Sequence, residues 1–343
     1  MPTIELPVWP YVYGQPSGSG VIRQLPEDFT VIEQLAFEPS GTGEHVFLQI
    51  QKTGENTDYV ARQLARVANV RQRDIGYAGI KDRHAVTTQW FSVWLPGLKD
   101  DPDWAQLASE RIKIVHTVRH ARKLKRGVLS GNSFKLIIRD WRGDQIKTNA
   151  QLELIKACGI ANYYGPQRFG NGGQNVNKAL AMFQGNKTSR ELRSLYLSAA
   201  RSYLFNEILA RRVSDKTWNQ ALAGDTYCFD LSHSWFKSAQ ADAEIRRRLA
   251  ANEIHPTGVL WGKGDADVAN DALAIEQAVI DANPELADGL IASAVAKDRR
   301  TLRINVQHLH WQFMDDSTLE LAFTLPAGCY ATSVLREIIK IPQ

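Results

Sequence analysis

The sequence predicts an α+β fold in which a helix-rich segment interrupts a sheet-rich one. Strand-like alternation of apolar and polar residues dominates before residue 145. Apolar residues then recur at helical spacing up to residue 292, and strand patterns return at 303–313 and 318–325. Sheet at both ends with helices between them favours an insertion over two consecutive domains.

The first part of the chain alternates strand patterns with one helix. Residues 1–20 are rich in Pro and Gly and end in the letters SGSG, so we expect a flexible lead-in. Residues 29–32, 45–51 and 85–95 have the alternating β-branched and aromatic composition of strands. A helix is expected directly after Asn56, which is a favoured capping residue.

A basic run follows the next predicted strand, at residues 112–118. In Arg119–Arg126, five of eight residues are Lys or Arg and none is acidic. Such a run is either a solvated basic face or a strip that neutralises nucleic-acid phosphates. In the strand predicted at 133–139, alternation places Asn132 and Phe134 on the same side, although an ordinary core position also explains Phe134.

The middle of the chain is predicted to be mostly helical, with irregular loops rich in Gly and Asn between the helices. Helical spacing occurs at residues 145–160, 196–213, 242–251, 272–282 and 284–292. The chain ends in a short amphipathic stretch at 331–341.

Composition excludes several classes of protein. The 343 residues are 44% hydrophobic, enough for a sizeable core, and the net charge of +4 is compatible with a polyanionic partner. Three widely spaced cysteines suggest neither a disulfide framework nor a zinc site. No apolar run reaches the roughly 18 residues of a membrane span, and no signal peptide is expected. We therefore expect a cytoplasmic protein, and nothing in the sequence demands more than a monomer.

The most informative stretch is Gly76–Phe91, with the sequence GYAGIKDRHAVTTQWF. Asp82 is predicted to lie on a loop just before a strand, between Lys81 and Arg83. Opposite charge nearby favours the ionised carboxylate, which can serve as a nucleophile or a base. On charge pattern alone, a solvated surface turn is the commoner explanation.

This stretch resembles the catalytic motif of the TruD family of tRNA pseudouridine synthases, in which the Asp after the Lys is catalytic. Three further blocks resemble the same family in the same order: Pro26–Glu33 (PEDFTVIE), Asn162–Gly170 (NYYGPQRFG) and Leu325–Thr332 (LPAGCYAT). Together the blocks run from near the N-terminus to near the C-terminus, so the resemblance covers essentially the whole chain.

The resemblance implies both architecture and reaction. Residues 1–155 and 304–343 would form a pseudouridine synthase catalytic domain with a mixed, mainly antiparallel sheet, and residues 156–303 a TRUD-type, mainly helical insertion domain. The implied reaction is isomerisation of uridine to pseudouridine in tRNA, at uridine 13 of the D-stem, with no metal or organic cofactor. The target base would be flipped out of the folded RNA. The implied partner is tRNA, with no obligatory protein partner.

The resemblance also implies the residues of the site. Asp82 takes the catalytic position and Phe134 that of the ring that stacks on the uracil. Phe29, Asn132 and Tyr330 are expected to line the substrate site, with the Asn132 amide reading a polar edge of the nucleotide.

Three questions stay open at this level. Arg23 and Lys81 are both candidates for the cation paired with Asp82, and Lys81 is alternatively a phosphate ligand. Arg168 either contacts the RNA backbone or fixes the junction between domains, and we favour the structural role. The chemical route is also undecided among attack at C1′, attack at C6 and abstraction of the C2′ proton.

Two other classes of function are weaker. A catalytically silent RNA-binding protein or chaperone would share the basic run but would not need a carboxylate at Asp82. A glycoside hydrolase generally uses two carboxylates, and the catalytic block supplies one. The sequence therefore favours an RNA pseudouridine synthase.

Overall fold

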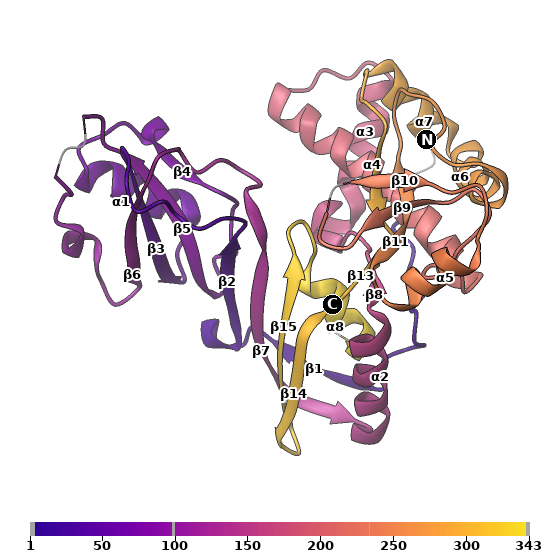
Figure 1. Cartoon of the computed structure of the whole chain (residues 1–343), viewed down its shortest axis with the longest axis horizontal. Coiled ribbons are helices and arrows are strands. Elements are labelled where there is room, and N and C mark those ends of the chain that lie inside the picture. The colour runs from indigo at the N-terminus through magenta and orange to yellow at the C-terminus, as the bar shows by residue number, and fades with distance from the viewer. Residues whose placement is uncertain (1–3, 98–99, 233, 341–343) are drawn as a thin grey trace. The chain divides into compact units, whose positions relative to one another are not determined.

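A computed structural model describes residues 4–97, 100–232 and 234–340, which form two compact units (Figure 1). The first, here called the sheet unit, comprises Ser17–Gln145, Val306–Gly328 and the segment from Ile339. The second, the helical unit, comprises the segment up to Pro16 together with Ile146–Asn305 and Cys329–Ile338. The segment up to Pro16 and the segment Cys329–Ile338, both expected in the catalytic domain, thus cluster with residues 146–305.

The sheet unit is built on a ten-stranded sheet whose main path is β14-β15-β7-β2-β5-β3-β6. The β2–β5 and β1–β16 pairs are parallel and the others antiparallel, so the predicted mixed, mainly antiparallel sheet is confirmed. The strands are β1 Gly18–Ile22, β2 Phe29–Leu35, β3 His45–Thr53, β4 Ile75–Tyr77, β5 Val86–Trp94, β6 Ile112–His120, β7 Leu129–Gly143, β14 Gln307–Asp315, β15 Thr318–Pro326 and β16 Ile339–Lys340.

The helix α1 (Thr57–Val67) supplies the main core of the sheet unit. Asn56 occupies its N-cap position, as predicted, although the Asn side chain makes no capping hydrogen bond. Val60 and Leu64 are fully buried against β3 and β5 residues such as Leu48 and Phe91. Burying such apolar area is the dominant favourable term in folding, so this contact stabilises the packing of α1 on β3 and β5.

The predicted flexible lead-in is wrong at its end, because Gly18–Ile22 forms β1 beside β7. Local composition suggested flexibility, but the glycines serve close packing. A Cβ on Gly18 would lie 2.7 Å from Trp141 Nε1, and one on Gly20 would lie 2.5 Å from Ile138 Cγ2. Only glycine lets this strand approach β7 so closely.

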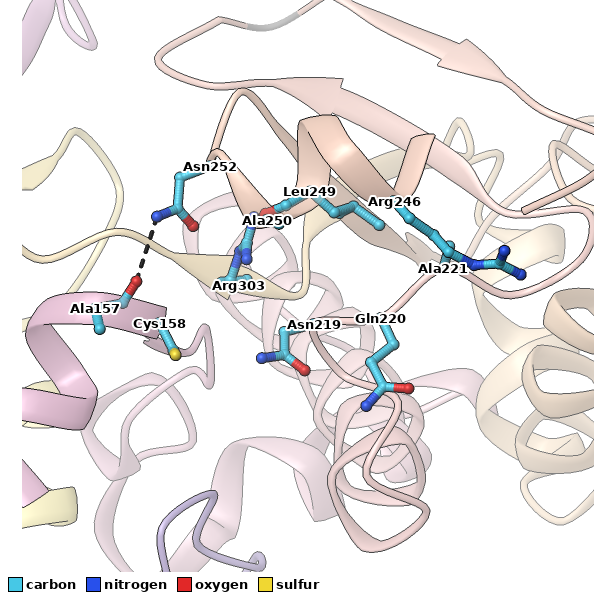
Figure 2. A pocket seen from close by; sticks show the side chains of 10 residues that line it. All are labelled: Ala157, Cys158, Asn219, Gln220, Ala221, Arg246, Leu249, Ala250, Asn252 and Arg303. Atoms are coloured by element: carbon cyan, nitrogen blue, oxygen red, sulfur yellow. Dashed lines mark hydrogen bonds between the residues drawn. The ribbon is translucent and has the colours of Figure 1, made fainter. Parts of the chain in front are cut away.

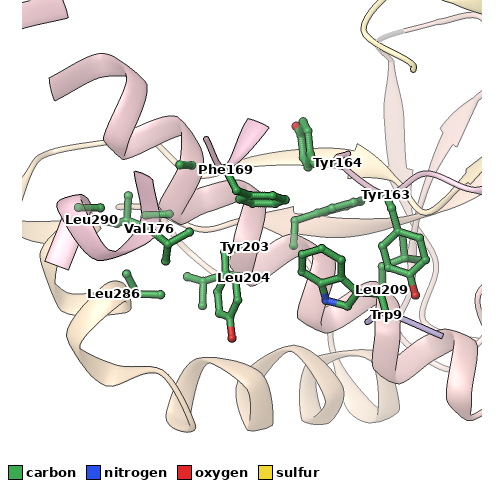
Figure 3. Close-up of a cluster of buried hydrophobic side chains, with 14 of the residues drawn as sticks. Trp9, Tyr163, Tyr164, Phe169, Val176, Tyr203, Leu204, Leu209, Leu286 and Leu290 are labelled. Carbon is green, nitrogen blue, oxygen red and sulfur yellow. The ribbon is translucent and has the colours of Figure 1, made fainter. Parts of the chain in front are cut away.

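The helical unit has a core formed by helices and by aromatic residues from distant parts of the chain (Figure 3). Trp9 of the N-terminal segment packs against Tyr163 and Phe169, with ring centroids 6.0 and 5.5 Å apart. Its helices are α2 Gln145–Cys158, α3 Gln174–Phe183, α4 Arg190–Ser214, α5 Ala243–Ala250, α6 Asn270–Asp281, α7 Pro284–Ala292 and α8 Ala331–Ile338.

The helical unit also contains strands that the sequence patterns did not predict. A four-stranded antiparallel sheet has the order β10-β9-β11-β12, with strands Trp235–Lys237, Thr226–Phe229, Ile254–Leu260 and Asp298–Thr301. A second pair joins β8 (Ile160–Ala161) to β13 (Arg303–Ile304). The single strand predicted at 303–313 is therefore wrong: β13 and β14 belong to different sheets. Most of these strands are too short to show alternation, and β11 contains a Pro and a Gly.

Candidate active site

Asp82 lies in the sheet unit on the connection between β4 and β5, as predicted. The backbone N–H of His84 donates to Asp82 Oδ1 over 3.1 Å, which orients the carboxylate locally. Thr30 of β2 pairs with Val86 of β5 in the parallel register. This pairing holds the end of the Asp82 loop beside the start of β2.

Arg23 is the cation that pairs with Asp82. Its Nη2 lies 2.9 Å from Asp82 Oδ2, and its guanidinium lies over the Phe29 ring at 4.1 Å from the centroid. Arg23 has a φ of 59°, an uncommon value for a residue with a side chain. Both partners of the ion pair are about one-third exposed, so it contributes little to stability. Its physical effect is to orient the carboxylate.

Lys81 is not the partner of Asp82, which corrects the alternative left open by the sequence. Its Nζ lies 2.5 Å from Glu33 Oε1, and Glu33 Oε2 accepts a hydrogen bond of 2.9 Å from the Trp90 N–H. The Glu33 side chain is fully buried. Through Glu33, Lys81 therefore ties the loop that contains Asp82 to β2 and β5.

Phe134 and Phe29 form an aromatic cluster on neighbouring strands. Phe134 is stacked on Phe323 with centroids 5.3 Å apart and meets Phe29 edge to face at 6.3 Å. Buried residues at 134, 136 and 138 of β7 confirm the predicted alternation. All three rings are buried, and the Arg23 guanidinium lies over the Phe29 ring.

Asn132 lies two residues before Phe134 on β7, opposite Glu33 of β2 in the register. Its Oδ1 atom is buried and, within the described residues, has no hydrogen-bond partner. A buried unpaired acceptor is costly, and such groups call for an explanation. An N–H donor from a bound base would satisfy it.

Glu33 is a buried carboxylate near Asp82 whose ion pair with Lys81 was not expected from the sequence. It falls within the quoted PEDFTVIE block, and strand alternation puts it in phase with Phe29 and Val31, both buried. A carboxylate in the buried phase of a strand signals an internal partner. That signal was present in the sequence.

Tyr330 belongs to the helical unit, as do all its polar contacts. Its hydroxyl accepts a hydrogen bond of 2.5 Å from Arg168 Nη2, and Arg168 Nη1 donates to Ser198 Oγ over 2.9 Å. The Arg168 guanidinium also lies 5.1 Å from the centroid of the Tyr164 ring. These contacts lie within the helical unit, and among the described residues the buried Nε of Arg168 has no hydrogen-bond partner. The role of Arg168 at a domain junction therefore stays a prediction.

The helical unit also contains a cavity of about 440 Å³, which is lined by residues other than those around Asp82 (Figure 2). It lies between the end of α2, α5 and β13, where Asn252 Nδ2 donates to the Ala157 carbonyl over 3.4 Å. None of the predicted site residues lines it.

Within residues 4–97, 100–232 and 234–340, no cluster of three or more His, Cys, Asp or Glu side chains is arranged to hold a metal. No helix in those ranges is long and apolar enough to cross a membrane.

Comparison with known proteins gives a consistent result. The family model "tRNA pseudouridine synthase D (TruD)" matches residues 6–185 and 172–338. The tRNA pseudouridine synthase D of Methylococcus capsulatus is 50% identical over 337 residues, covering 97% of this chain and 95% of the relative. That of Hydrogenovibrio crunogenus is 42% identical over 98% of each chain. A crystal structure of a putative TruD from Methanosarcina mazei is similar in fold, with a TM-score of 0.76 at 22% identity over 96% of this chain and 95% of that one.

Proposed function

The chain belongs to the TruD family of tRNA pseudouridine synthases, and from this premise we propose that it converts uridine 13 of the tRNA D-stem to pseudouridine, with Asp82 as the catalytic carboxylate. The overall reaction is an isomerisation. The bond between C1′ and N1 of the uridine breaks, the uracil turns, and C1′ bonds to C5. C5 then loses its proton and N1 gains one, so the product is an isomer of the substrate. Nothing is oxidised or reduced.

The surroundings of Asp82 support this role. Its two oxygens are oriented by the His84 N–H and by Arg23, while about one-third of the side chain stays accessible. A carboxylate held in this way is ready to attack C1′ or C6, or to take the C2′ proton, without first reorganising. The single observation that carries the proposal is this ion-paired, accessible carboxylate on the family's catalytic motif.

The aromatic cluster and Asn132 support base flipping. A uridine inside a folded D-stem is stacked and paired, so it must leave the stack before its C1′ and C5 can be reached. We propose that the flipped uracil contacts Phe134 and Phe29 and that a base N–H donates to Asn132 Oδ1. These contacts would offset part of the unstacking cost.

The first test is the conversion of Asp82 to Asn. Asn keeps the size of the side chain and can still accept from the His84 N–H, but it is neither nucleophile nor base. We expect the wild type to form one pseudouridine in unmodified tRNA, at position 13, and Asp82→Asn to form none while still binding the tRNA. Sequencing-based pseudouridine mapping and filter binding measure the two results.

The matched control is Asp140→Asn, the same chemical change at an exposed position of β7. It should retain wild-type turnover. Normal product from Asp82→Asn would refute the catalytic assignment. If the wild type and Asp82→Asn both bind tRNA but neither forms pseudouridine, the chain is a silent RNA-binding protein.

A further inference from the structure

A buried lysine lies directly behind the catalytic loop. Lys52 of β3 has no solvent exposure, and its Nζ donates to the backbone carbonyls of Asp82 over 3.1 Å and of Glu55 over 2.7 Å. Removing an ammonium group from water is expensive unless hydrogen bonds and opposite charge replace the lost hydration. Burying the Lys52 ammonium at this position therefore carries a substantial desolvation cost.

Two uncharged side chains hold the loop on the other side of Asp82. The Lys81 N–H donates to Thr57 Oγ1 over 3.1 Å, and the Thr57 hydroxyl donates to Gln89 Oε1 over 3.0 Å. Gln89 Nε2 in turn donates to the Gly79 carbonyl over 3.1 Å. The backbone from Gly79 to Asp82 is thus fixed at three points by buried residues of β3, α1 and β5.

The charge on Lys52 interacts with the site as well as with its own partners. Burial is the largest cause that lowers the pKa of Lys52, and Lys81 acts in the same direction, while Asp82, Glu33 and Glu55 act in the opposite direction; the net result is a pKa of about 8. Asp82 is the largest of these opposing charges. Near neutral pH the ammonium form is therefore present, and the positive charge is lost as the pH rises through about 8.

We propose that Lys52 is a positioning residue for the reaction, which fixes the Asp82 peptide and supplies a buried positive charge behind the catalytic carboxylate. The inference rests on the proposed role of Asp82. Thr57 and Gln89 perform the uncharged part of the same task. Lys52 acts through Asp82, because its nitrogen donates to the backbone of the loop and is closed off from solvent.

The direct test is Lys52→Met, which keeps the length of the side chain and removes both its charge and its donors. We expect the single-turnover rate constant to fall about 10- to 100-fold, the effect of a small misplacement of a reacting group, with the KM for tRNA unchanged. Wild-type activity should decline as the pH rises through about 8, and Lys52→Met should lack this decline. A rate equal to wild type, or a change confined to KM, would overturn the inference.

Thr57→Val separates charge from positioning. It removes the bonds to Lys81 and Gln89 but leaves the ammonium in place, so the rate constant should fall while the decline near pH 8 persists. Lys113→Met, at an exposed position of the adjacent strand β6, is the control and should match wild type. If the rate constant of Thr57→Val did not decline as the pH rises through about 8, the decline in the wild type could not be assigned to the charge on Lys52.

Hydrogen exchange gives a readout that does not depend on turnover. In Lys52→Met, the amides of residues 81–85 should exchange faster, while those of β14 and β15 keep wild-type protection. Unchanged exchange at 81–85 would refute the positioning role. A wild type that forms no pseudouridine would instead refute the proposed function, so the two failures are distinguishable.

Discussion

At the scale of single residues, the two ion pairs near Asp82 differ in burial, and this separates their roles. Lys81 and Glu33 are 12% and 0% exposed, whereas Arg23 and Asp82 are 33% and 35% exposed. Breaking the first pair would strand a buried charge, which is strongly destabilising. Breaking the second would cost little stability. The buried pair therefore stabilises the loop, whereas the accessible pair can rearrange at little cost in stability.

His255 is a buried, titratable residue of the helical unit with a polar partner at each ring nitrogen. Its Nδ1 accepts from Arg303 Nε over 2.9 Å, and its Nε2 lies 2.8 Å from Asp230 Oδ1. This pattern requires the neutral imidazole, since a proton on Nδ1 would point at the guanidinium. Burial, the largest cause, lowers the pKa of His255 below its ordinary value of 6.5.

We predict that the helical unit loses stability as the pH falls below about 6.5. Below this pH the unfolded chain binds a proton at His255 that the folded chain does not bind. The free energy of unfolding therefore falls by at most about 1.4 kcal/mol per pH unit. In His255→Gln, the amide can keep both bonds without titrating, so thermal melts should show a shallower decline. His310→Gln, at an exposed position, should keep the wild-type slope. Identical slopes in all three proteins would exclude His255 as the source.

At the scale of elements, β6 and the turn after it hold the basic run in a definite form. The strand extends through His120, so Arg119 lies within the sheet and pairs with Asp101. Leu124 is buried, and Lys123 Nζ donates to the Arg73 carbonyl over 2.5 Å. The basic residues of this run that are exposed, and so accessible to a polyanion, are Arg122, Lys125 and Arg126.

We predict that changing Arg122, Lys125 and Arg126 together to Ala weakens tRNA binding. Each lost phosphate contact should flatten the log–log dependence of affinity on salt by roughly one unit. Titrations at several salt concentrations measure the slope. The control removes three exposed cations elsewhere, Lys187, Arg190 and Arg193. A slope unaffected by the first triple change would locate the phosphate contacts outside this run.

At the scale of the whole molecule, the chain passes between the two units several times, so sequence neighbours often belong to different cores. The segment up to Pro16 and the helix α8 pack with residues 146–305, while β14 and β15 complete the large sheet. Trp9 ties the N-terminal segment into the helical core, and its Nε1 donates to Glu207 Oε1 over 3.0 Å.

We predict that Trp9→Ala destabilises the helical unit by about 3–5 kcal/mol, the usual cost of removing a large buried aromatic side chain. Hydrogen exchange should show lost protection in α3 and α4 while β3 and β5 keep theirs. Val8→Ala is the control, since Val8 is 82% exposed. Equal loss of protection in both units would mean that the chain unfolds as one cooperative body.

The sequence by itself determined the α+β class, most helices, several strands of the large sheet and the motif that contains Asp82. These features depend on local spacing, which a linear pattern records. Helix α1, for example, was predictable because Val60, Leu64 and Val67 repeat at its period.

Only the tertiary structure decided which charges meet. Arg23 reaches Asp82, Lys81 reaches Glu33, and Lys52 reaches the Asp82 carbonyl across separations that no local pattern encodes. The tertiary structure likewise decided β1, β11 and β12, because each of these strands pairs with a partner distant in sequence. Register and close packing are properties of the assembled sheet, and they fix these contacts.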